Sequence, residues 1–282
     1  MGYAGYGIRQ GSVRFGSIAV TLLATSLVAA ALVPFPSAVE AQTTTRIMIR
    51  VVAHDAKIIG SAVGGVRITI RNAKTGSLLA QGVQLGGTGD TRRLVREPRA
   101  RGASVFDTEG AAGFLAELEL EEPTQIRIEA EGPLEMTDAI QRVSRTMFVV
   151  PGQDVLGDGV ILEMYGFTVE LIEPTSDLTK AAGKEVVVRA RVTMLCGCPT
   201  EPGGLWDSTD YTIESRIVRG GEILQKVTLV YAGESSIYEG VITVPESVEG
   251  LSLQVLAMDA ANANFGIFER PFDELGRGQS SD

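Results

Sequence analysis

The chain has 282 residues, of which 44% are hydrophobic and 21% charged, and its formal net charge is −10. This composition is typical of a globular protein, and the negative charge disfavours nucleic acid and anionic lipid, which carry the same sign. The two cysteines, Cys196 and Cys198, are too few for a fold built on disulfides, so its cores must depend on buried apolar side chains.

An uncharged apolar run, residues 17–33, follows Arg9 and Arg14 and ends before Pro34. This order predicts an export signal cleaved after Ala41. The alternative is an uncleaved N-terminal membrane anchor, because about 20 apolar residues suffice to span a bilayer. Both predict an extracytoplasmic protein that is periplasmic, secreted or anchored to the outer side of the cytoplasmic membrane.

Apolar residues alternate with period two along most of the remaining chain, which is the pattern of strands. In the first part we expect strands at 47–52, 66–71, 77–83, 105–107, 114–120, 125–130, 139–150 and 160–164. In the second part we expect them at 167–173, 185–194, 211–218, 223–231, 236–244, 251–258 and 265–269. The fold class is therefore predicted to be all-β, with two antiparallel β-sandwich domains of the immunoglobulin or transthyretin type after an N-terminal hydrophobic helix. The expected boundaries are 1–41 for the signal or anchor, 42–165 and 166–270 for the sandwiches, and 271–282 for a flexible tail.

Four short segments of the first sandwich share a pattern with a known family. They are the strand region 61–71, a Thr-Gly hairpin at 74–76, an Asp-x-x-Gly turn leading to Phe114, and the strand 126–132. The region from about residue 45 to 165 resembles the carboxypeptidase-regulatory-like domain, a transthyretin-like sandwich. This resemblance implies a binding or spacer module rather than a catalyst. Residues 254–266 resemble the last hairpin of bacterial immunoglobulin-like domains.

The chain departs from the family between Gly82 and Ser104, where a long Gly- and Arg-rich segment replaces a tight connection. Guanidinium groups pair bidentately with carboxylates and phosphates, so this segment is a predicted partner-docking site for an acidic protein face or lipid headgroups. The alternative is a solvated loop that folds back on acidic strand residues such as Glu117, Glu119 and Glu121. The candidate docking residues are Arg92, Arg93, Arg96, Arg99 and Arg101.

The segment Met194 to Cys198 places three sulfur-containing residues at alternate positions. If it is extended, Met194, Cys196 and Cys198 lie on one face and form a possible Cu(I) or thiol redox site. The expected role is nevertheless structural, either as buried packing beside Trp206 or as a Cys196–Cys198 disulfide, which export to an oxidising compartment favours.

The sequence offers no recognisable catalytic set. Its single histidine, His54, has no nucleophile motif beside it. Several Asp and Asn residues could supply oxygens for calcium, but turn chemistry is expected to explain them: Asp154, Asp158, Asp259, Asn262 and Asn264.

We therefore expect no enzyme and no cofactor. The predicted function is that of an extracytoplasmic accessory subunit that docks onto a larger membrane-associated complex, for example a photosynthetic or respiratory one. The alternative is a copper or thiol redox carrier that uses Met194, Cys196 and Cys198.

Overall fold

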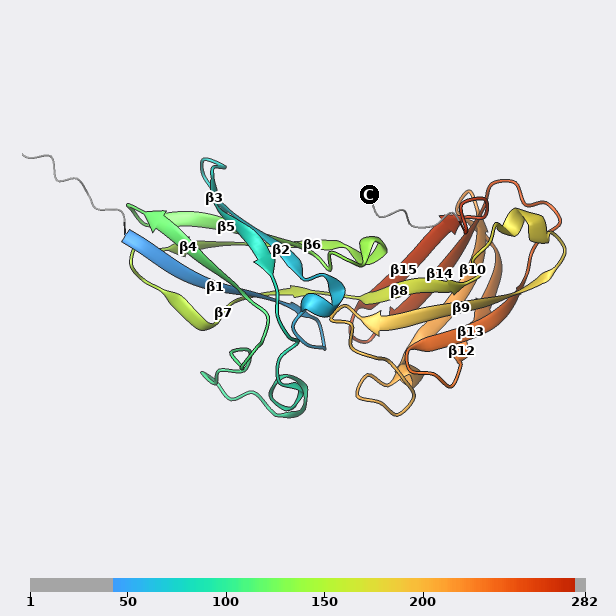
Figure 1. Ribbon diagram of the computed structural model, residues 1–282, viewed down its shortest axis with the longest axis horizontal. Helices are drawn as coiled ribbons and strands as arrows, with labels where there is room; N and C mark the ends of the chain where they lie inside the picture. Colours follow the sequence, from blue (N-terminus) through green and yellow to red (C-terminus); the bar gives the residue numbers. More distant parts are fainter. Residues whose placement is uncertain (1–42, 277–282) are drawn as a thin grey trace, which may run out of the picture. The chain divides into compact units, whose positions relative to one another are not determined.

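The computed structural model describes residues 43–276, and strands account for most of them (Figure 1). The predicted export signal or anchor lies outside these residues. Within the described range, no helix is both long enough and apolar enough to cross a membrane. The prediction of an all-β fold is confirmed for residues 43–276.

Seven strands form the two sheets of the first sandwich. They are β1 (Thr43–Ala53), β2 (Val66–Asn72), β3 (Leu78–Gln84), β4 (Phe114–Leu120), β5 (Thr124–Gly132), β6 (Gln141–Val149) and β7 (Val155–Met164). One sheet has the order β4-β1-β7 and the other β3-β2-β5-β6. The β1–β7 pair is parallel, whereas the other pairs are antiparallel. The antiparallel prediction is therefore wrong for this pair, because two strands so far apart in sequence need no hairpin between them.

Eight strands form the second sandwich. They are β8 (Phe167–Glu173), β9 (Glu185–Met194), β10 (Thr212–Arg219), β11 (Glu222–Thr228), β12 (Val230–Tyr231), β13 (Ile237–Thr243), β14 (Leu251–Asp259) and β15 (Asn264–Pro271). The sheet orders are β11-β10-β14-β15 and β12-β13-β9-β8. Strand pairing passes from the first set to the second at Tyr165 and Gly166, the boundary that the sequence predicts. Independent folding of 42–165 and 166–270 stays a prediction.

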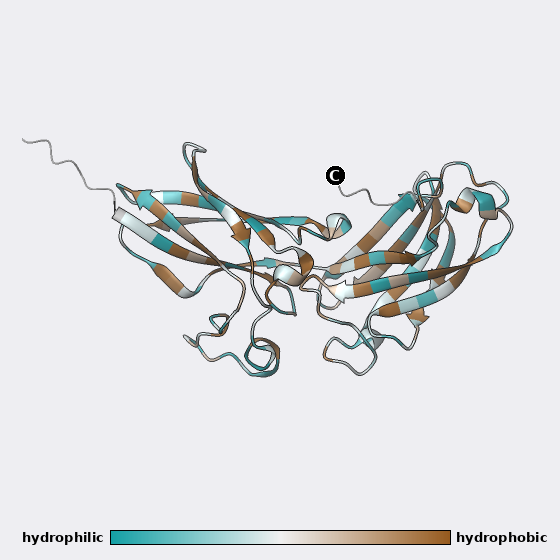
Figure 2. Cartoon of the chain, viewed as in Figure 1, coloured by the Kyte–Doolittle hydropathy of each residue, from teal (hydrophilic) through white to brown (hydrophobic). Residues whose placement is uncertain are grey.

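Alternation along each strand separates core from surface, as the brown and teal bands of Figure 2 show. In β14, Leu251, Leu253, Val255 and Ala257 are at most 2% exposed. Because successive side chains point to opposite faces, a period-two pattern buries one row of each strand and leaves the other in water.

Short helical turns lie in the connections: η1 (Ser61–Val63), η2 (Arg92–Arg96), η3 (Thr137–Ala139), η4 (Leu178–Ala181) and η5 (Ser208–Asp210). The expected strand 223–231 is interrupted at Leu229, which is 3% exposed and donates its N–H to Ile213 O. Burial of Leu229 separates β11 from β12, and the two strands pair in different sheets.

The predicted start of the flexible tail, residue 271, lies too early in the chain. Phe272 and Leu275 are 1% and 4% exposed, and Phe272 donates its N–H to Leu251 O. These two apolar side chains hold residues 271–276 against the second sandwich, so the described fold extends at least to Gly276.

Candidate functional site

The arginine-rich loop, residues 85–113, connects β3 to β4 and closes on itself at its base. Leu85 and Gly113 form an antiparallel bridge, and Ala112 donates its N–H to Gly87 O at 2.8 Å. The loop therefore leaves the sheet and returns to it at one place.

Asp158 of β7 anchors the returning half of the loop. Its carboxylate accepts hydrogen bonds of 2.8 Å from Ser104 Oγ and from the backbone N–H groups of Val105, Phe106 and Asp107. Burial alone would raise the pKa of Asp158, but these hydrogen bonds together hold it below its ordinary value. The expectation of a strand at 105–107 is wrong because these N–H groups bond to a side chain rather than to a neighbouring strand.

Arg50 of β1 gives the loop a second anchor. Its side chain is 3% exposed and donates to Ala112 O at 2.9 Å, to Gly157 O at 3.3 Å and to Asp107 Oδ1 at 2.8 Å. The sequence did not single out this residue, because its partners are 57 to 107 residues away.

A small apolar cluster separate from the main core lies under the loop. Its buried members are Val52, Ile58, Leu94, Val105 and Ala112, with Val95, Phe106, Ala111 and Ile161 packed against them. Satellite clusters of this kind are typical of long loops that are folded. Residues 85–113 thus form an ordered insertion with their own apolar contacts.

The five candidate arginines are all exposed, but they differ in their contacts. Arg92 pairs with Glu97 at 2.8 Å inside the loop. Arg99 donates to Leu94 O at 3.1 Å and lies over the Phe106 ring, 5.1 Å from its centroid. Arg93, Arg96 and Arg101 form no ion pair or side-chain hydrogen bond with the residues described.

The loop folds back on its own sandwich, although onto β1 and β7 rather than onto the acidic face of β4. Glu119 of β4 accepts a hydrogen bond from Thr44 Oγ1 at 2.6 Å, and Glu117 lies opposite Arg46 in the register of β1 and β4. Apolar packing and the contacts of Asp158 and Arg50, rather than ion pairs to Glu117 or Glu119, hold the loop in place.

A groove of about 510 Å³ lies beside the loop. Its floor combines apolar side chains from β1 and the turn after it, from the loop and from β7: Val52, Ala53, Ala56, Leu94, Val95, Phe106 and Ile161. Charged side chains line it as well: Asp55, Glu97, Arg99 and Glu163. Sequence reasoning missed this groove because three distant segments form it.

An aromatic pair adjoins the rim of the groove. His54 and Tyr165 stack with their ring centroids 4.0 Å apart. His54 Nδ1 lies 2.9 Å from Glu163 Oε1, and Tyr165 donates its hydroxyl to Glu163 Oε2 at 3.3 Å. The only histidine of the chain is thus engaged in a local contact.

Asp55 differs from the other carboxylates of the rim. No hydrogen bond or ion pair joins its carboxylate to a side chain among the described residues, while its backbone carbonyl accepts a hydrogen bond from Trp206 Nε1 at 2.8 Å. Burial raises the pKa of Asp55, and the neighbouring Asp259 adds to this effect while His54 opposes it. Asp55 is an exposed residue, and its carboxylate therefore carries a charge with no cation bonded to it among the described residues.

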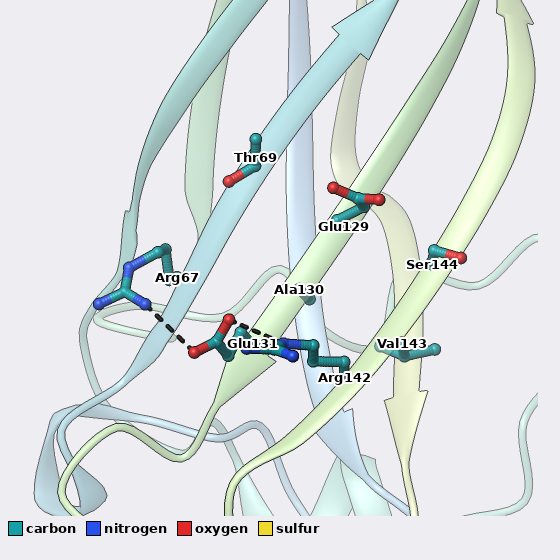
Figure 3. A pocket seen from close by; sticks show the side chains of 8 residues that line it. All are labelled: Arg67, Thr69, Glu129, Ala130, Glu131, Arg142, Val143 and Ser144. Atoms are coloured by element: carbon teal, nitrogen blue, oxygen red, sulfur yellow. Dashed lines mark hydrogen bonds and ion pairs between the residues drawn. The ribbon is translucent and has the colours of Figure 1, made fainter. Parts of the chain in front are cut away.

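A second hollow, of about 260 Å³, lies on the outer face of the sheet β3-β2-β5-β6 (Figure 3). Arg67 and Arg142 flank Glu131 and pair with it at 3.3 and 2.9 Å. A hydrogen bond from Arg142 lowers the pKa of Glu131. These charges satisfy one another across neighbouring strands, which is ordinary stabilisation of an exposed sheet face.

The candidate soft-metal segment is a turn rather than an extended strand. β9 ends at Met194, and Gly197, with φ of 75°, donates its N–H to Met194 O at 2.8 Å. Cys196 and Cys198 are joined in a disulfide and are 2% and 5% exposed, while Met194 is fully buried. The extended arrangement with three aligned sulfurs is therefore wrong, and the disulfide form offers no thiolate to a soft metal.

Trp206 packs in the core, and Asp154 and Asp259, two of the candidate calcium ligands, bond to neighbouring protein groups instead. Trp206 is 6% exposed and belongs to the main core. Asp154 pairs with Arg46 at 2.6 Å, and Asp259 accepts hydrogen bonds from the backbone of Ala261 and Asn262. Among residues 43–276, no group of three or more His, Cys, Asp or Glu side chains is arranged to hold a metal.

No family model and no curated protein matches the chain. Among solved structures, an engineered protein is similar at 16% identity and a TM-score of 0.26, over 43% of this chain and 23% of that one. Fibronectin(III)-like modules of CbhA from Clostridium thermocellum are similar at 12% identity and a TM-score of 0.25, over 80% and 90%. The Z1Z2 domains of titin, in a complex with telethonin, are similar at 12% identity and a TM-score of 0.20, over 81% and 94%.

Strand pairing and burial make the described chain all-β, with two sandwiches of two sheets each. The chain spans less than a quarter of the engineered protein's length. With TM-scores of 0.20 to 0.26, these similarities carry no argument about function.

Proposed function

We propose that this chain is a non-catalytic extracytoplasmic accessory protein that docks onto a larger membrane-associated complex through the arginine-rich loop. The observation that supports this best is the contrast within the loop: its backbone is anchored, while the guanidinium groups of Arg93, Arg96 and Arg101 are exposed and form no ion pair or hydrogen bond among the described residues. A preformed loop loses little conformational entropy on binding, which improves affinity.

The proposed partner presents an acidic protein face. Arginine forks match carboxylates, and a chain with a formal charge of −10 is repelled by an anionic lipid surface at longer range. A photosynthetic or respiratory complex is the proposed kind of partner, because the predicted export signal or anchor would place the chain on the outer side of such a membrane.

We also propose that the first sandwich is of the carboxypeptidase-regulatory-like type. The hairpin between β2 and β3 supports this assignment, because it contains the Thr-Gly turn of the family. Asn72 Oδ1 accepts hydrogen bonds from the N–H groups of Lys74 and Thr75, and Gly76 has φ of 75°. The Gly- and Arg-rich insertion is then the feature that distinguishes this chain within the family pattern.

The docking proposal is tested by changing the three free arginines together. We expect full-length protein with Arg93, Arg96 and Arg101 changed to Gln to lose its partner in mild-detergent purification from native membranes. The matched control changes Arg71, Arg127 and Arg145 to Gln, which removes the same charge from β2, β5 and β6. Equal partner recovery from both proteins as salt is raised would contradict docking through the loop.

A further inference from the structure

The groove beside the loop has an apolar floor and an acidic rim, and a long basic side chain complements both. Its floor is apolar, with Val52, Val95 and Ile161 from three separate segments, and its volume is about 510 Å³. Its rim contains carboxylates. Lysine and arginine place a long aliphatic stem on apolar surface while their charged end reaches a polar rim.

The charges around the groove are unbalanced among the described residues. Glu97 pairs with Arg92, and Glu163 contacts His54 and Tyr165. The guanidinium of Arg99 is engaged with Phe106 and with a backbone carbonyl. No such partner reaches the carboxylate of Asp55, whose pKa is raised by burial.

We propose that this groove receives a lysine or arginine side chain of a partner protein, with the stem on the apolar floor and the cationic group against Asp55 and Glu163. An anionic group would be repelled by the same carboxylates. A purely apolar side chain would bury the Asp55 carboxylate without compensation, which is unfavourable. A cation adds a charge-assisted hydrogen bond, and its stem on the apolar lining would exclude part of the water around that contact.

This inference goes beyond docking through the loop arginines and does not depend on it. The two surfaces recognise opposite charges, so they are separable by mutation. Together they would fix the register of a partner that presents acidic side chains to the loop and one basic side chain to the groove.

The test uses two fluorescein-labelled peptides of sequence Thr-Val-Lys-Val-Thr, one with lysine and one with Nε-acetyllysine, and fluorescence anisotropy with the full-length chain in mild detergent. The acetylated peptide keeps the aliphatic stem and loses the charge. We expect it to bind about tenfold more weakly, since a hydrogen bond to a charged group typically contributes this much or more.

Asp55→Asn is the informative variant. Asp55 has φ of 51°, a conformation that asparagine adopts readily, so the backbone is expected to be retained. We expect roughly tenfold weaker binding of the lysine peptide by this variant. Glu163→Gln serves as a second variant at the rim and is expected to weaken the same peptide. The control Glu109→Gln removes an equal charge from an exposed residue of the same loop that does not line the groove, and we expect it to leave the affinity unchanged.

Four outcomes would overturn the proposal. Equal binding of the two peptides, or no binding of either, would exclude recognition of a cation. If Glu109→Gln and Asp55→Asn weakened binding of the lysine peptide equally, the effect would come from the net charge of the protein and not from a contact in the groove. Self-association of the chain that Asp55→Asn abolishes, without effect on peptide binding, would mean that a second copy occupies the groove.

Discussion

The two long loops of this chain are held in different ways. Residues 85–113 are anchored by hydrogen bonds to Asp158 and Arg50 and by a small apolar cluster of their own. Residues 195–211 begin with a disulfide and insert Trp206 into the main core. The first arrangement leaves a charged outer surface free for a partner, whereas the second buries the most distinctive side chain of its loop. Unusual composition is therefore a guide to function only where the side chains stay exposed.

The largest expected loss of stability follows a change in residues 195–211, the loop that Trp206 attaches to the main core. We expect Trp206→Ala to lower the free energy of unfolding by about 3–5 kcal/mol, because it removes a large buried ring. Urea unfolding followed by circular dichroism measures this. Trp206→Phe keeps a ring but loses the hydrogen bond to Asp55 O, so it should cost less. A cost below about 1 kcal/mol for Trp206→Ala would show that the loop does not depend on the core.

A smaller effect is expected from the anchor of the arginine-rich loop. We expect Asp158→Asn to destabilise the loop locally by about 1–3 kcal/mol, because a charged acceptor of several hydrogen bonds is lost. Hydrogen exchange of the N–H groups of residues 105–107 should accelerate, while exchange in β14 should not. Acceleration in both regions would mean that the loop and the second sandwich unfold together.

The same carboxylate predicts a pH dependence. The pKa of Asp158 is lower in the folded chain than its unfolded value of about 3.9. The ionised carboxylate therefore stabilises the loop fully above that pH, and this stabilisation is lost as the pH falls through the folded pKa. Exchange of residues 105–107, corrected for intrinsic rates, should therefore accelerate in acid for the unmodified chain. Asp158→Asn should show a much flatter profile, and identical profiles would exclude Asp158 as the titrating group.

Reduction of the disulfide should lower the free energy of unfolding only modestly, because the disulfide closes a ring of only a few residues. The loop-entropy relation gives about 1.6 kcal/mol for a ring this short. Urea unfolding with and without dithiothreitol measures the difference. A double variant, Cys196→Ala with Cys198→Ala, should be insensitive to the reductant. A loss several times larger would mean that the disulfide holds more of the fold than its own turn.

The smallest effect on stability is expected for the free arginines. Replacing Arg93, Arg96 and Arg101 with Gln should change the free energy of unfolding by less than about 0.5 kcal/mol per residue, since exposed side chains without partners contribute little. Thermal unfolding of the triple variant checks this. A large loss would show that the arginines stabilise the loop and would weaken the case for docking.

The sequence predicts the strands well because period two is a local signal. Leu251 to Ala257 alternate in the sequence as they do in the structure. The alternation mispredicts a strand where residues distant in sequence determine the backbone hydrogen bonds. At Val105 to Asp107, the N–H groups bond to Asp158, about fifty residues later. The alternation fails also at Met194 to Cys198, where Gly197 turns the chain.

The candidate site was only partly predictable for the same reason. Its arginines stand out in the sequence as a cluster of positive charge. The groove does not, because its floor brings Val52, Val95 and Ile161 together from three segments, and the isolation of Asp55 is a property of its surroundings.

The closed base of the arginine-rich loop has a consequence for how such a chain can diversify. Because Leu85 and Gly113 are paired, whatever lies between them begins and ends at neighbouring points, and a change in loop length adds little closure entropy. The stretch between these two residues can thus vary in length at low entropic cost. A new loop sequence would leave both sheets unchanged if it kept the contacts with Asp158, Arg50 and the apolar cluster.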